Sequence, residues 1–155
     1  MHEELMRVAI ALSIENVRTG RGGPFAAVVA KDGALIGRGV NLVTATNDPT
    51  AHAEVAAIRA ACQALGSFHL AGCELYTTCE PCPMCLGAIY WARLARYYYG
   101  NTRSDAARIG FDDALIYQEL GKLPEERGVG GIRLLPREAA EAFNEWMRAP
   151  VKVPY

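Results

Sequence analysis

Short apolar runs alternate along this chain with longer segments that carry the periodicity of a helix. Residues 25–30 are continuously apolar, which predicts a strand covered on both faces. The Asp-Gly signal within residues 31–33 predicts a turn, and residues 34–43 form the expected returning strand. A helix is predicted over residues 3–18, because apolar side chains recur there at i, i+3, i+4 and i+7: Leu5, Val8, Ala9 and Leu12.

The alternation continues through the rest of the chain. Three further strands are predicted at residues 74–78, 96–99 and 131–135, and further helices at 51–65, 81–94, 112–120 and 137–148. Helices that alternate with strands favour an α/β fold, here a three-layer α/β/α sandwich around a five-stranded mixed sheet. No repeat or linker interrupts the pattern, so residues 1–155 are predicted to form a single domain.

Size and charge limit the classes of function. A chain of 155 residues buries roughly two thirds of its surface, so it needs no metal or disulfide merely to fold. Sixteen basic and seventeen acidic residues give a net charge of −1, which argues against nucleic acid as a partner. No run approaches the roughly 20 apolar residues of a membrane span. An odd number of cysteines and no apolar leader favour a reducing, cytoplasmic setting.

Two short segments carry residues that bind metals, and each falls at a predicted helix start: His-Ala-Glu at 52–54 and Pro-Cys-Pro-Met-Cys at 81–85. Cys82 and Cys85 are three residues apart and therefore share a helix face. His52 and Glu54 are roughly 200° apart around a helix, so both cannot ligate a metal beside it. A metal over the helix N-terminus can take His52 while Glu54 approaches from another side. The spacing predicts three ligands and one unligated carboxylate.

Three protein ligands leave a fourth tetrahedral position for water, as in catalytic zinc sites. Zinc lowers the pKa of bound water toward ~7, and we expect Glu54 to carry the protons. One Zn²⁺ per subunit is therefore predicted. The alternative is a structural zinc site with four ligands, for which Cys79 is the available fourth residue. Cys62 and Cys73 are interpreted as small buried apolar residues.

The combination of His-x-Glu with Pro-Cys-x-x-Cys resembles the signature of the zinc nucleobase deaminases. Within them the chain is most similar to the small bacterial guanine deaminases, through residues 22–25, 47–54 and 79–92. Residues 110–113 and the terminal Tyr155 distinguish that group from the tRNA adenosine deaminases. The resemblance implies a cytidine-deaminase-like fold and hydrolysis of guanine to xanthine and ammonia. It also implies a homodimer that exchanges its C-terminal segments, so that Tyr155 completes a neighbour's pocket.

Selectivity for one base requires groups that pair with its edges. Asn41 offers both amide donors and an acceptor, which suits a mixed purine edge. Asp113 offers acceptors for ring N–H groups, a role that rests mainly on the resemblance. The remaining candidates are two aromatic side chains that could wall a flat ring and one backbone N–H: Phe25, Trp91 and Ala53.

Other functions use the same zinc chemistry. A tRNA adenosine deaminase should place Lys and Arg near its pocket. Residues 43–51 contain neither, and residues 103–113 mix two arginines with three aspartates. Cytosine deaminase is a second enzymatic alternative. A non-catalytic zinc module is a third, although it should have lost the unligated carboxylate that Glu54 provides.

Overall fold

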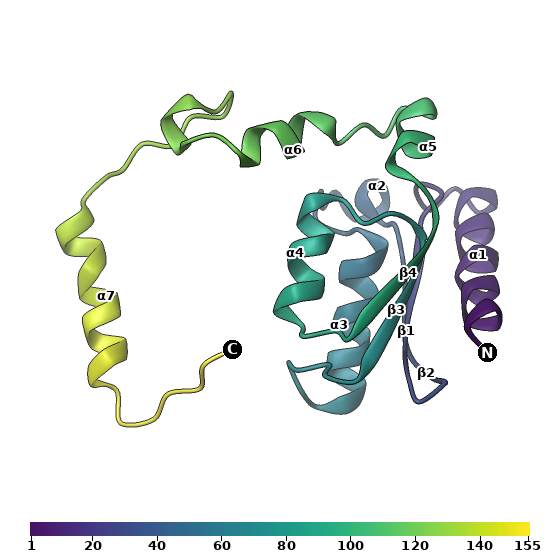
Figure 1. Ribbon diagram of the computed structural model, residues 1–155, viewed down its shortest axis with the longest axis horizontal. Coiled ribbons are helices and arrows are strands. Elements are labelled where there is room, and N and C mark those ends of the chain that lie inside the picture. The colour runs from purple at the N-terminus through teal and green to yellow at the C-terminus, as the bar shows by residue number, and fades with distance from the viewer. The chain divides into compact units, whose positions relative to one another are not determined.

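The computed structural model describes residues 1–155, which group into two compact units, Met1–Asp113 and Ala114–Tyr155 (Figure 1). Each unit is described by itself. The first contains nine elements: α1 (His2–Arg18), β1 (Ala26–Lys31), β2 (Ala34–Val40), α2 (Val43–Thr46), α3 (Ala53–Leu65), β3 (Cys73–Cys79), α4 (Pro83–Trp91), β4 (Arg96–Asn101) and α5 (Arg103–Arg108). The second contains α6 (Ala114–Leu120), the 3₁₀ helix η1 (Pro124–Glu126) and α7 (Pro136–Arg148).

The sheet has four strands in the order β2-β1-β3-β4. β1 is antiparallel to both β2 and β3, whereas β3 and β4 are parallel. Both the hairpin and the mixed character of the sheet are therefore confirmed. Strand β1 is buried along its length apart from Lys31, as its unbroken apolar sequence predicted.

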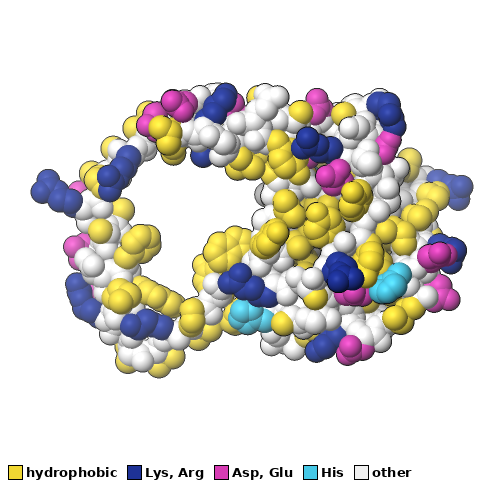
Figure 2. Space-filling model, in the orientation of Figure 1, with side chains coloured by type: hydrophobic (Ala, Val, Ile, Leu, Met, Phe, Trp, Pro, Cys, Tyr) yellow, Lys and Arg dark blue, Asp and Glu magenta, His cyan; other side chains and the backbone are white.

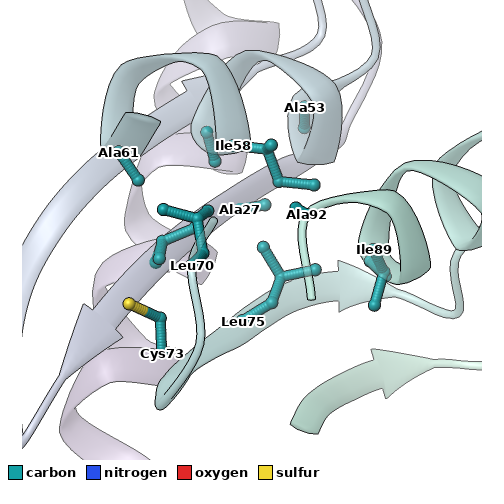
Figure 3. Packing of buried hydrophobic residues seen from close by; sticks show 11 residues of the cluster. Ala27, Ala53, Ile58, Ala61, Leu70, Cys73, Leu75, Ile89 and Ala92 are labelled. Carbon is teal, nitrogen blue, oxygen red and sulfur yellow. The ribbon is translucent and has the colours of Figure 1, made fainter. Parts of the chain in front are cut away.

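Helices cover both faces of the sheet, which confirms the three-layer α/β/α arrangement (Figure 1). On one face, α3 and α4 pack against the side chains of β1 and β3 that point toward them (Figure 3). Alternate residues of the same strands point to the opposite face, as the period of a strand requires. There Val28, Ala30 and Tyr76 pack against Leu5 and Ala9 of α1.

Helix α3 lies unusually close to β2 because β2 contains glycine where the two elements meet. A Cβ atom at Gly39 would lie 2.1 Å from the carbonyl oxygen of Ala53 and 2.4 Å from the backbone nitrogen of Ala57. Any larger residue would collide with the first turns of α3. This contact fixes the N-terminal end of α3 relative to the sheet.

The predicted fifth strand was wrong. Residues 131–135 form no strand, and Ile132 is 90% exposed and Leu134 77% exposed. A strand needs a neighbouring strand for its backbone hydrogen bonds, and nothing pairs with this segment. The short helices α2 and α5 were not predicted, because four and six residues are too few to show helical periodicity.

The second unit carries an amphipathic helix, α7, whose apolar side chains are exposed: Phe143, Trp146 and Met147. Hydrophobic side chains are also visible at the surface of this unit in Figure 2. None of the helices is both long and apolar enough to span a membrane.

Candidate zinc site

Two helix N-termini bring the metal-binding residues together. His52 is the N-cap of α3, and Cys82 is the N-cap of α4, with Cys85 in the first turn of the same helix. The N-terminus of a helix carries partial positive charge, which stabilises thiolates nearby. Pro83 begins α4 without removing a helical hydrogen bond, because the first N–H of a helix has no partner within the helix.

The three ligand atoms form a compact cluster. The Nδ1 atom of His52 lies 3.5 Å from the sulfur of Cys82 and 3.5 Å from the sulfur of Cys85. All three atoms lie within 4.8 Å of one another. Tetrahedral zinc with ordinary bond lengths separates a nitrogen ligand from a sulfur ligand by about 3.6 Å. The residues therefore fit one Zn²⁺ bound through two sulfurs and Nδ1 of His52.

The pKa values of Cys82 and Cys85 also favour a bound cation. A hydrogen bond from Cys85 is the main cause that lowers the pKa of Cys82 to about 4, and His52 lowers it further, although burial opposes them. The pKa of Cys85 is raised, first by that same hydrogen bond and then by burial. Ionising both sulfurs without a cation is therefore unfavourable. A dication between the sulfurs would allow both to ionise.

Glu54 lies beside this cluster and is 6% exposed. Its Oε2 is 3.4 Å from the sulfur of Cys85, and its Oε1 is 3.4 Å from the hydroxyl of Thr77 on β3. Burial is the largest influence on its carboxyl group and raises its pKa, because charge is disfavoured away from water. A buried carboxyl beside three ligands is placed to accept and return protons.

Asn41 follows β2 and is buried. Its backbone N–H donates to the carbonyl of Phe25 at 3.0 Å, and its Oδ1 accepts from the N–H of Val43 at 3.3 Å. Because a backbone N–H can only donate, this contact fixes the amide orientation and leaves Nδ2 as the donor for a ligand. Phe25 packs edge-on against Phe111, with centroids 4.9 Å apart. Ala53 is fully buried in the first turn of α3.

The other candidates lie in different places. Asp113 is half-buried, and burial first, then the charge of Cys82, raises its pKa, so its carboxyl lies in the field of the cluster. Trp91 is 61% exposed at the last residue of α4. Nine residues of helix separate it from Cys82 by about 13 Å, so the structure does not bring Trp91 to the site. Tyr155 belongs to the second unit and is 73% exposed.

Cys79 does not join the ligands. Its sulfur is 3.7 Å from the carbonyl oxygen of Thr102, and burial raises its pKa to about 11. This favours three ligands over the structural site with four. Cys73 is buried in the core, as interpreted from the sequence, and Cys62 is half-buried against it.

Two polar residues near the site were missed at the sequence level. Thr77 lies in a strand otherwise rich in buried residues, and Asn16 continues the buried stripe of α1 after Leu5 and Ala9. Their sequence signal is that each is a polar residue at a position that the hydrophobic pattern assigns to the core. Most buried polar groups have hydrogen-bond partners; Thr77 bonds to Glu54, 23 residues away, and Asn16 bonds to Asn41, 25 residues away.

Comparisons with known proteins agree with this geometry. Residues 1–101 match the family model of the cytidine and deoxycytidylate deaminase zinc-binding region. A guanine deaminase of Bacillus subtilis is 51% identical over 99% of both chains, and its crystal structure superimposes with a TM-score of 0.97 at 50% identity, covering 100% of this chain and 99% of that one.

Two further proteins show how far the likeness extends. A guanine deaminase from Nitrosomonas europaea superimposes with a TM-score of 0.66 at 32% identity, covering 91% of this chain and 81% of that one. A tRNA-specific adenosine deaminase of Agrobacterium fabrum is 53% identical, but over 50% of this chain and 51% of its own length. The fold, the cluster and the full-length likeness agree: this chain belongs to the family defined by the cytidine and deoxycytidylate deaminase zinc-binding region.

Proposed function

We propose that this protein is a zinc-dependent aminohydrolase that converts guanine and water to xanthine and ammonia. The observation that carries the proposal is the buried carboxyl of Glu54, which lies beside His52, Cys82 and Cys85 without being needed as a ligand. Identity over nearly the whole chain to a guanine deaminase supports guanine as the base.

The reaction needs an attacking oxygen and two proton transfers. A Zn²⁺ ion held by His52, Cys82 and Cys85 would lower the pKa of water and so supply hydroxide at neutral pH. Glu54 accepts the proton of that water and delivers it to N3 of guanine as C2 is attacked. It then takes a second proton from the hydroxyl group newly bonded to C2 and delivers it to the amino group on the same carbon. The C2–N bond breaks, ammonia leaves, and the oxygen remains as the new carbonyl of xanthine.

The base must be recognised away from C2. The Nδ2 of Asn41 can donate to an acceptor on the purine edge, and Asp113 can accept from ring N–H groups. An analogue that leaves a buried donor or acceptor unpaired is rejected strongly. Phe25 offers its ring, steadied by Phe111, as a wall for the flat base.

We also propose that a second copy of the chain completes the site. The second unit exposes far more apolar surface than a unit of its size should leave to water, including Ile132, Leu134, Phe143 and Met147. A homodimer that exchanges these segments would cover this surface and bring Tyr155 to a neighbour's pocket. The five cysteines form no disulfide, which fits work in the reducing cytoplasm.

A substrate panel tests the function. Ammonia release is measured with guanine, adenine, cytosine and a tRNA stem-loop, using enzyme with and without its zinc. We expect turnover of guanine that is lost on chelation and restored by added zinc. Undiminished turnover after complete removal of zinc would overturn the chemistry. Rapid adenosine deamination in RNA with no guanine turnover would overturn the substrate and identify a tRNA adenosine deaminase.

A further inference from the structure

Asn16 is a buried polar residue on α1, and none of the roles described above uses it. It is 2% exposed, on the face of α1 that packs against the sheet. Its Nδ2 donates to the carbonyl oxygen of Asn41 at 2.8 Å and to that of Gly23 at 2.9 Å. Both hydrogens of one amide group therefore join two segments that are far apart in the sequence.

These two segments carry groups that the proposed function assigns to the base. Asn41 is the edge-reading residue, and Gly23 lies two residues before Phe25, with its Cα position facing the rings of Phe25 and Phe111. The backbone of Asn41 is also tied to Phe25 by the 3.0 Å hydrogen bond between them. Asn16 thus fixes the main chain of both segments from the side of α1.

The packing around Asn16 allows only an asparagine-like donor. Both partners are carbonyl oxygens, so the group facing them must donate, and a carboxylate there would meet two acceptors. The Oδ1 of Asn16 is buried with no hydrogen-bond partner, which costs free energy. Gly22 keeps the space open, because a Cβ there would lie 2.1 Å from the carbonyl oxygen of Asn41 and 3.2 Å from Nδ2 of Asn16.

We infer that Asn16 is a positioning residue for base recognition: by fixing the main chain at Asn41 and Gly23, it sets where Nδ2 of Asn41 and the ring of Phe25 meet the purine. The inference rests on the proposed function and deepens it. Asn16 has no bond to α3 or α4, which carry Glu54 and the zinc ligands. Its loss should therefore weaken binding of the base and leave the chemical step largely intact.

The test compares Asn16→Ala and Asn16→Asp with the wild type. We expect KM for guanine to rise about tenfold in Asn16→Ala, and further in Asn16→Asp, while kcat changes less than about threefold. Zinc content should stay the same. Ser13→Ala is the matched control, because Ser13 is buried one turn earlier on α1 and donates only to Ile10 of the same helix. Its KM should equal that of the wild type.

A double-mutant cycle separates positioning from general stability. Because Asn16 holds Gly23 as well as Asn41, Asn16→Ala should still raise KM in the Asn41→Ala background, but by a smaller factor than in the wild type. The inference would be overturned if the two variants raised KM by factors that multiply fully in the double variant. An unchanged KM in folded Asn16→Ala would overturn it as well. If Asn16→Ala does not fold, Gly22→Ala is used instead, because its methyl group would displace the carbonyl oxygen of Asn41. An unchanged KM in Gly22→Ala would also overturn the inference.

Failure of the Asn16 inference can be told apart from failure of the proposed function. Wild-type turnover of guanine is measured first. If the wild type deaminates a different base, guanine is the wrong substrate, and the Asn16 comparison is made with the base that is turned over.

Discussion

At the scale of single residues, the proposed chemistry depends on one carboxyl group that lies close to the three candidate zinc ligands but is not one of them. Glu54 differs from His52, Cys82 and Cys85 in having a second anchor, the hydroxyl of Thr77. Replacing it with glutamine keeps its length and an oxygen that can accept from Thr77. Proton transfer disappears, so we expect kcat for ammonia release to fall roughly 10²- to 10⁴-fold in Glu54→Gln.

Zinc content distinguishes the role of Glu54 from that of a ligand. Glu54→Gln should retain one zinc per subunit when the metal is measured by emission spectrometry, because its three ligands are unchanged. Loss of zinc together with activity would make Glu54 a fourth ligand and the geometric argument wrong. Glu15→Gln, a change at an exposed position on α1, should leave both zinc and rate unaltered.

The ligand cluster could be predicted from spacing alone, because each segment falls at a helix start and helix geometry fixes which side chains can converge. The contacts of Asn16 could not. Its partners are the main-chain carbonyls of Gly23 and Asn41, and a carbonyl carries no sequence signal. Trp91 was a candidate because its aromatic ring could wall a flat base, and the structure places it, exposed, at the last residue of α4.

At the scale of elements, the position of the site depends on how closely α3 approaches β2. Gly39→Ala places a methyl group within 2.1 Å of the carbonyl oxygen of Ala53, and overpacking of this kind costs about 1–3 kcal/mol. The first turn of α3 must move, and His52 moves with it. We expect a lower urea midpoint and weaker zinc retention during dialysis against a chelator.

Gly87→Ala is the matched control for this change. Gly87 lies within α4, and a Cβ there would meet nothing within 4 Å. Alanine is favoured over glycine inside a helix by up to about 1 kcal/mol, so this variant should be as stable as the wild type or more so. A wild-type midpoint in Gly39→Ala would mean that α3 can leave β2 without loss, and that the close approach does not hold the site.

The elements that the sequence predicted well are those whose pattern is long or unbroken. The periodic stripe of α1 and the continuous apolar run of β1 each leave a local signature. The segment at residues 131–135 has apolar residues too, but pairing is not local, and no neighbouring strand exists for it. The proposed homodimer would account for its apolar side chains.

At the scale of the whole molecule, the proposed exchange of C-terminal segments makes two predictions, one about Tyr155 itself and one about the copy of the chain that supplies it. If Tyr155 serves the pocket, Tyr155→Ala should lower kcat/KM about tenfold or more with little change in stability. Full activity of this variant would remove Tyr155 from the site. A dimer in sedimentation is required as well, since a monomer has no neighbour with which to exchange a segment.

Complementation between two impaired subunits then decides where Tyr155 acts. Glu54→Gln and Tyr155→Ala chains are co-expressed with different tags, and the heterodimer is purified through both. With exchange, the site that keeps Glu54 receives Tyr155 from its partner, whereas the other site lacks both groups. One site of two then works, so the heterodimer should recover about half of the wild-type rate. Without exchange, each site lacks one essential group, and the heterodimer would be no more active than its parents.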